Sequence, residues 1–186
     1  DFAGRKMGVP GFGGSFDVVT RYWVKANGVD IKQVNWVELQ FPQMGDALKS
    51  GLVDATLAVN PFYARILDAK LGTDIGNPWN SAPNGTMIVL YASTRAWATK
   101  NKEAVAGFRA SLAEAIAYIS DPAHLPAVRD SITKWTKLPP QAAASIAIPD
   151  DLEPVAKPDG LKFWIGAARD QGLIKGNPDP ASLIAP

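Results

Sequence analysis

Short apolar segments alternate with helical segments along the first half of this chain, and that alternation limits the possible folds more than any other feature. Four segments have the length and apolar content of strands: residues 6–9, 34–39, 54–59 and 86–92. Between the first two of these, apolar residues from Val18 to Trp23 recur at helical spacing. Strands that alternate with helices indicate an α/β unit with a mostly parallel sheet flanked by helices.

The second half is predicted to be mainly helical. One long stretch carries a single apolar stripe at helical spacing, formed by Val105, Phe108, Leu112, Ile116 and Ile119. Weaker helical patterns follow at residues 125–136, 140–146 and 158–171. The predicted fold class is therefore an α/β lobe with a C-terminal helical segment.

The composition of the 186 residues excludes several classes of protein. Cysteine is absent, so the chain forms no disulfide and offers neither a thiol nucleophile nor a cysteine zinc site. The formal net charge of +1, without a basic run, argues against a nucleic-acid binder held by phosphate contacts. His124 is the only histidine, and no His or Glu spacing suggests a metal site. We therefore predict no metal, no cofactor and no enzymatic activity.

A glycine-rich turn, Pro10-Gly11-Phe12-Gly13-Gly14-Ser15, lies between the first predicted strand and a helix. Ser15 is predicted to be the N-cap, because its hydroxyl can accept a hydrogen bond from the free N–H groups of the helix start. Glycines let a ligand approach the backbone, and those N–H groups suit an anion. A tight turn that needs positive φ explains the same glycines. From the residues alone, both interpretations stay open.

Two further loops follow predicted strands, and in parallel sheets ligands bind beyond the carboxyl ends of the strands. After the third strand, Asn60 could hydrogen-bond a ligand and Phe62 could stack on it. Alternatively, Asn60 caps the next helix and Phe62 packs in the core. Gln43 follows the second strand, where a plain turn with a solvated side chain is the simpler interpretation.

Four motifs occur in a fixed order within residues 1–105, as part of a resemblance that covers nearly the whole chain: DFAGRKMGVPG from Asp1, ALKSGLVDA from Ala47, NPF from Asn60 and NKEAV from Asn101. In this order they resemble the type II periplasmic solute-binding proteins of ABC transporters. The most similar subfamily binds aliphatic sulfonates, nitrate and taurine and is grouped with the binders of pyrimidine precursors. Asn60 replaces an acid of the family motif, which disfavours a taurine-like ligand, and the cysteine-rich signature of the pyrimidine synthases is absent.

The resemblance implies two lobes joined by a hinge, with a small solute clamped between them. Residues 1–93 would form the second α/β lobe, and residues 94–186 the hinge return and the C-terminal helices that belong to the first lobe. The family's N-terminal segment is not in this chain, so we expect a truncated chain. The ligand-binding positions carried over from the family are Phe12, Gly13, Gly14, Ser15, Gln43, Asn60 and Phe62.

The function that the resemblance implies is that of the substrate-binding component of an ABC importer. Such a protein is a periplasmic monomer, exported by a signal peptide outside this chain. It would capture a small organic anion (a sulfonate, a nitrate-like anion or an aromatic carboxylate) and dock on a permease in the inner membrane. One alternative is the ligand-sensing effector domain of a LysR-type transcription regulator, which needs a helix-turn-helix ahead of the lobes. Another is an enzyme on this scaffold, which would depend on His124.

Overall fold

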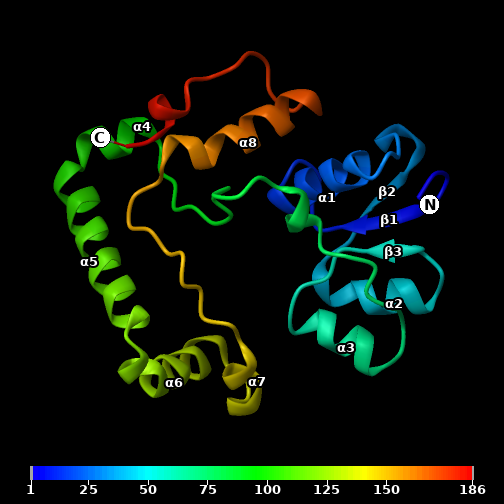
Figure 1. Ribbon diagram of the computed structural model, residues 1–186, viewed down its shortest axis with the longest axis horizontal. Coiled ribbons are helices and arrows are strands. Elements are labelled where there is room, and N and C mark those ends of the chain that lie inside the picture. The colour runs from blue at the N-terminus through cyan, green and yellow to red at the C-terminus, as the bar shows by residue number, and fades with distance from the viewer. Residues whose placement is uncertain (1, 186) are drawn as a thin grey trace. The chain divides into compact units, whose positions relative to one another are not determined.

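The computed structural model describes residues 2–185, which divide into two compact units. Unit 1 comprises the chain up to Ile88 together with Pro158–Leu183. Unit 2 comprises Val89–Lys157 and the last residues from Ile184. The sheet lies in unit 1, and unit 2 is built from helices (Figure 1).

Unit 1 has a three-stranded parallel sheet in the order β2-β1-β3. Its main elements are β1 (Lys6–Val9), α1 (Ser15–Ala26), β2 (Asn35–Glu38), α2 (Met44–Lys49), β3 (Ala55–Thr56), α3 (Phe62–Asp68) and α8 (Pro158–Asp170). Helix α1 covers one face of the sheet, and α2 and α3 cover the other (Figure 1). This architecture confirms the predicted α/β lobe with a parallel sheet flanked by helices.

Short 3-10 turns complete the connections: η1 (Ile31–Gln33), η2 (Phe41–Gln43), η3 (Pro78–Ser81), η4 (Pro122–His124) and η5 (Pro180–Leu183). The core of unit 1 lies between β1 and the helices. Met7 and Val9 of β1 and Val19 and Val24 of α1 have at most 2% of their surface exposed. Full burial of such a side chain contributes about 1.5–3 kcal/mol, so these residues hold α1 on the sheet.

The start of α1 differs from the prediction, whereas its end agrees with it. Ser15 is the first helical residue, and Gly14 takes the N-cap position without a side-chain cap. Asp17 in the first turn instead accepts the N–H of Gly13 through Oδ2 at 2.8 Å. Its carboxylate therefore closes the turn ahead of the helix, and the N–H groups of the helix start have no side-chain cap, contrary to what we expected of the Ser15 hydroxyl. Gly28, with φ of +81°, ends the helix as predicted.

The prediction of a fourth strand at residues 86–92 is wrong. The Met87 N–H donates to the carbonyl of Gly160 at 3.2 Å, and the Trp164 Nε1–H donates to the Met87 carbonyl at 2.6 Å. Because α8 satisfies these backbone groups, the segment pairs with no strand among the described residues. The third strand is shorter than predicted, although the Asp54 and Leu57 N–H groups donate to β1 and extend the pairing by one residue on each side.

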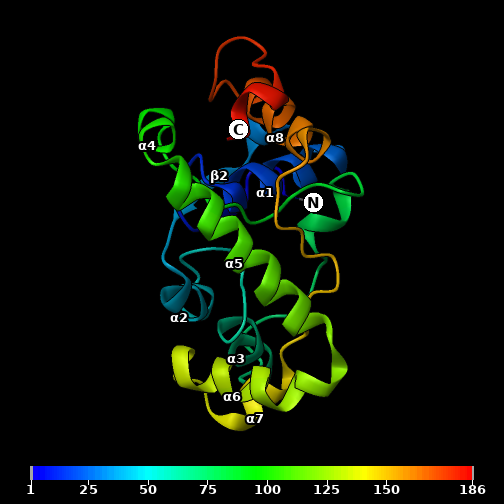
Figure 2. The same cartoon turned by 90° about the vertical axis from the view of Figure 1, so that its left-hand side faces the viewer.

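Unit 2 is helical, as predicted for the segments that it contains. Its helices are α4 (Arg95–Lys100), α5 (Lys102–Ser120), α6 (Leu125–Thr136) and α7 (Pro140–Ser145). Figure 2 shows α5 along its length, with α4 at one end and α6 and α7 at the other. Arg129 of α6 joins α6 to α7 by donating to the carbonyls of Ala143, at 2.6 Å, and Ile146.

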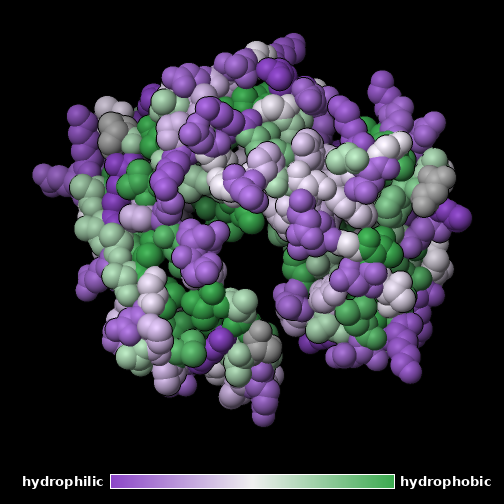
Figure 3. Space-filling view, in the orientation of Figure 1, coloured by the Kyte–Doolittle hydropathy of each residue, from purple (hydrophilic) through white to green (hydrophobic). Residues whose placement is uncertain are grey.

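Helix α5 has 19 residues, and none of them is buried. Its predicted apolar stripe is half-exposed, and Phe108 has 48% of its surface exposed. Hydrophobic surface is accordingly visible over α5 and α6 (Figure 3). No helix of the described residues combines the length and the hydropathy needed to cross a membrane.

Helix α8 packs in unit 1, whereas the sequence prediction grouped it with the rest of residues 94–186. Its buried residues Leu161 and Ile165 lie on one helical face. The Phe163 ring contacts Tyr22 of α1 edge to face at 4.9 Å, and the Gln171 Nε2–H donates to the Val18 carbonyl at 2.9 Å. The assignment of residues 94–186 to the first lobe of a two-lobed protein stays a prediction.

Candidate functional site

The three strands run in parallel, so their carboxyl ends lie at one edge of the sheet, which we call the carboxyl edge. The loops after them, residues 10–14, 39–43 and 57–61, all leave the sheet there. Every predicted site residue lies in one of these loops or at the first residue of the helix that follows: Phe12, Gly13, Gly14, Ser15, Gln43, Asn60 and Phe62. The topology thus collects at one edge residues that are up to 50 positions apart in sequence.

Three phenylalanine rings join these loops, and we call them the phenylalanine trio: Phe16, Phe41 and Phe62. Phe16 meets Phe41 edge to face, with ring centroids 5.3 Å apart. Phe41 in turn stacks with Phe62 at 6.4 Å. All three side chains are half-buried, and none belongs to the buried core cluster around Met7. The trio therefore ties the loops together while keeping part of each ring accessible.

Sequence analysis missed Phe16 and Phe41 as site residues. Phe16 follows the glycine-rich turn directly, and Phe41 begins η2, two residues before Gln43. Their positions after strand ends were the available signal, because side chains there face the carboxyl edge. Their contact with each other depends on tertiary structure and has no local signature.

The glycine-rich turn supports both interpretations of its glycines, namely a tight turn that needs positive φ and a turn that can bind an anion. Gly11 and Gly13 have φ of +84° and +75°, which favours glycine whatever the ligand. The Gly13 N–H is also taken, because it donates to Asp17. The N–H groups of Gly14 and Ser15 make no hydrogen bond to another described residue, as expected at a helix start. An anion at this turn would therefore contact Gly14 and Ser15 rather than Gly13.

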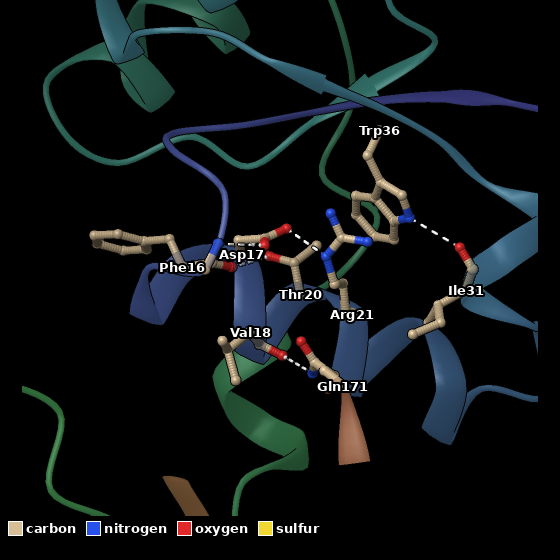
Figure 4. Close-up of polar contacts among 9 residues, drawn as sticks. Phe16, Asp17, Val18, Thr20, Arg21, Ile31, Trp36 and Gln171 are labelled. Atoms are coloured by element: carbon tan, nitrogen blue, oxygen red, sulfur yellow. Dashed lines mark hydrogen bonds and ion pairs between the residues drawn. The ribbon is translucent and has the colours of Figure 1, made fainter. Parts of the chain in front are cut away.

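A buried ion pair lies beneath the turn (Figure 4). Asp17 has 2% of its surface exposed, and Arg21 Nε donates to its Oδ1 at 2.6 Å. The Arg21 guanidinium lies over the Trp36 ring at 4.2 Å and near the Phe12 ring at 5.6 Å. Because each charge is paired, the turn keeps its shape without presenting net charge to a ligand. Neither Asp17 nor Arg21 was among the predicted site residues.

The two amide side chains at the edge differ in what they leave for a ligand. The Gln43 Oε1 accepts the N–H of Gln40 at 3.0 Å, and the two residues form a capping box on η2. The Gln43 side chain therefore offers a ligand its amide N–H groups as donors. Asn60 is exposed and bonds to no other described side chain or backbone group, and Pro61 takes the N-cap position of α3. The alternative in which Asn60 caps α3 is therefore not adopted.

Helix α3 contributes a cation, Arg65, and a tyrosine, Tyr63, that bonds to a carboxylate beyond the helix. The Arg65 Cζ lies 5.9 Å from the centre of the Phe62 ring, and this exposed side chain forms no ion pair within the described residues. Tyr63 donates from its hydroxyl to Asp74 at 2.9 Å. The pKa of Asp74 is lowered by the Gly76 N–H first and by Tyr63 second. The pKa of Tyr63 is raised, chiefly by the same hydrogen bond.

The groups gathered at the carboxyl edge are of kinds that can contact a solute. No group of three or more His, Asp or Glu side chains that could hold a metal ion occurs in the described part of the chain. His124 lies in unit 2, where its ring stacks on Tyr118 at 3.8 Å. The carboxyl edge offers N–H donors, amides, aromatic faces and one cation.

An α/β unit with its loops gathered at the carboxyl edge of a parallel sheet is a general arrangement of ligand-binding α/β folds, and the periplasmic-binding-like fold shares it. The model of the NMT1-like family matches residues 2–133, most of the chain, and the chain belongs to that family. A curated relative is the nitrate/nitrite binding protein NrtA of Synechococcus elongatus, which is 32% identical over 117 residues. The match covers 61% of this chain and 26% of NrtA, so the chain spans about a quarter of its relative's length.

Proposed function

We propose that this chain is part of the substrate-binding component of an ABC importer and captures a small anion such as nitrate, an organic sulfonate or an aromatic carboxylate. The observation that carries the proposal is the convergence of three loops, joined by the phenylalanine trio, at the carboxyl edge. The similarity to a protein named for nitrate and nitrite binding supports the choice of an anion.

In this proposal the chain binds its solute and makes or breaks no bond. The N–H groups of Gly14 and Ser15, at the positive end of α1, donate to the anion. Asn60 and the amide group of Gln43 donate further hydrogen bonds, and Phe62 contacts the apolar part. In the periplasm, ligand contacts would favour a closed state that docks as a monomer on a permease in the inner membrane.

The proposal is tested by calorimetric titration of the purified chain with nitrate, methanesulfonate and taurine. A hydrogen bond to a charged group contributes about 1.5–3 kcal/mol, so we expect Asn60→Ala to weaken the binding of an anion by about tenfold or more. Phe62→Ala should also weaken binding, because it removes an apolar contact. The Asn60→Asp variant restores an acid. This variant should weaken the binding of nitrate and methanesulfonate by charge repulsion. It should strengthen the binding of taurine, because the new carboxylate can pair with the amine of taurine.

Two matched variants serve as controls. Asn84→Ala and Phe108→Ala remove the same side chains at exposed positions outside the three loops and should leave the affinity unchanged. Unchanged affinity in both Asn60→Ala and Phe62→Ala would contradict the assignment of the site. Failure of the unaltered chain to bind any of these anions would contradict the proposed function itself.

A further inference from the structure

The phenylalanine trio continues into a larger aromatic surface in unit 1. Phe16 also contacts Trp79 of η3 edge to face at 6.0 Å. These four side chains are half-buried, whereas the core residues Met7 and Met44 have at most 2% of their surface exposed. The rings therefore keep apolar area that a ligand could still remove from water, and burial of that area favours binding.

Phe41 and Phe62 give this surface a preferred ligand shape. Their rings are parallel to within 6°, and Phe16 meets Phe41 at 87°. A planar ligand that stacks on Phe41 or Phe62 is parallel to both, and the Phe16 ring completes an edge-to-face contact. A puckered or tetrahedral ligand gains no such stacking. The geometry favours a flat ring over an aliphatic group of equal size.

The charges near the trio favour an anion and indicate where its charged group lies. Arg65 is on the same helix as Phe62, one turn further on, and its guanidinium is near that ring. Glu38 is exposed at the end of β2, and the strand order places β2 and β3 on opposite sides of β1. An anionic group is therefore more stable on the β3 side of the edge, beside Arg65, than beside β2.

We propose that the phenylalanine trio and Arg65 form a subsite for a planar aromatic anion, a solute of the benzoate or benzenesulfonate type. This inference rests on the proposed function and narrows it from small anions in general to aryl anions. Phe41 and Arg65 are then specificity-determining residues: the first selects the flat ring, and the second selects the negative charge.

Two ring carboxylates test the subsite by calorimetry on the unaltered 186-residue chain. Benzoate and cyclohexanecarboxylate carry the same charge on six-membered rings, but only benzoate is planar. We expect benzoate to bind about tenfold more tightly, which is the upper range for aromatic pairing. Benzenesulfonate should likewise bind more tightly than methanesulfonate and nitrate.

Single substitutions separate the contribution of the Phe41 ring to binding from that of the Arg65 charge. Phe41→Leu should remove most of the preference for benzoate and leave cyclohexanecarboxylate nearly unchanged. Arg65→Gln should weaken both carboxylates alike, by about two- to fivefold, as expected for one exposed charge. Phe108→Leu and Lys25→Gln are matched controls: Phe108 is an exposed ring in unit 2, and Lys25 lies at the far end of α1. Neither should change binding.

The outcomes distinguish this inference from the broader proposal. Equal affinity for the two ring carboxylates, or binding of nitrate without either of them, would overturn the aryl subsite and leave the proposed function standing. Binding of no anion at all would overturn both. The comparison of ligands uses the unaltered chain, so it decides the question even if a Phe41 variant does not fold.

Discussion

At the scale of single residues, the buried pair of Asp17 and Arg21 is the contact on which the glycine-rich turn most depends. Asp17 accepts from the Gly13 N–H and from Arg21, and almost none of its surface is exposed. Loss of Arg21 would leave a carboxylate buried without a compensating charge. Such a loss costs far more than the pair itself contributes.

We therefore predict that Arg21→Met lowers the free energy of unfolding by about 3 kcal/mol, measured by urea denaturation. The double variant Asp17→Asn/Arg21→Met should recover part of that loss, because no buried charge remains. Arg5→Met is the matched control, since the Arg5–Asp54 pair is 3.7 Å long and exposed, and it should change little. A small effect of Arg21→Met would show that water compensates Asp17.

The contact between Tyr63 and Asp74 predicts a pH dependence with a definite sign. Because the pKa of Asp74 is lowered from 3.8, its contribution to stability is complete above that pH and is lost as the pH falls through the lowered pKa. Because the pKa of Tyr63 is raised from 10.0, its contribution is complete below that pH and is lost as the pH rises through the raised pKa.

An NMR titration of the Asp74 carboxyl carbon checks this assignment. In Tyr63→Phe the pKa of Asp74 should rise only in part, because the larger cause, the Gly76 N–H at 2.8 Å, remains. Asp159 provides a comparison, since Lys162 lowers its pKa by a side-chain hydrogen bond and by charge. Lys162→Met should therefore return the pKa of Asp159 to its ordinary value. A full return of the Asp74 pKa in Tyr63→Phe would contradict the role of Gly76.

At the scale of elements, the seat of α8 in unit 1 depends on a glycine. A β-carbon at Gly160 would lie 2.3 Å from the Met87 Cγ and 3.0 Å from the Gly85 carbonyl oxygen. The chain at Met87 also bonds to α8 through Gly160 and Trp164. The missing side chain thus lets residues 85–87 lie against the helix.

We predict that Gly160→Ala destabilises unit 1 by about 1–3 kcal/mol, the usual cost of overpacking, although alanine favours helices. Gly166→Ala in the same helix is the matched control, because nothing lies within 4 Å of its β-carbon. That variant should stabilise the protein by about 0.5–1 kcal/mol. Thermal unfolding of the two variants gives the comparison, and equal changes in both would refute the close contact.

The elements also show where sequence reasoning succeeds. Local signals predicted the alternation of unit 1, the bounds of α6 and the glycine that ends α1, because periodicity and left-handed glycine act within a few residues. The segment at residues 86–92 was misassigned because its apolar residues suit a strand, whereas α8, some 70 residues later, binds the backbone of Met87 within it. Periodicity contains no information on such a distant partner.

The candidate site also has one part that sequence reasoning predicted and another part that it missed. Parallel topology placed Gln43, Asn60 and Phe62 at one edge of the sheet, since strand direction follows from the alternation of elements. The contact of Phe16 with Phe41, and the use of the Gln43 oxygen within η2, are details of packing. They become visible only once the loops are placed in space.

At the scale of the whole molecule, the two units differ in how much they bury. Of the 18 buried apolar residues in the described chain, 15 are in unit 1, and only Ala98, Val128 and Ala143 are in unit 2. Regions with few buried apolar contacts open at low free energy. The stability of the protein is therefore concentrated around the sheet.

We predict that hydrogen exchange followed by mass spectrometry finds strong protection in β1 and α1 and weak protection along α5. Addition of 1–2 M urea should increase exchange in unit 2 first, because its helices bury little apolar area. Peptides from α8 should follow β1 rather than α5, since α8 packs in unit 1. Uniform protection across both units would contradict this division.

The packing of α8 on α1 also affects how the chain folds during its synthesis on the ribosome. Gln171, which bonds to Val18, is synthesised 153 residues after it. At roughly 5–20 residues per second, translation needs roughly 8–30 s to cover that interval. During this time the face of α1 that α8 later covers is open to chaperones and proteases. The nascent chain must therefore survive with this face of α1 uncovered until α8 has emerged from the ribosome.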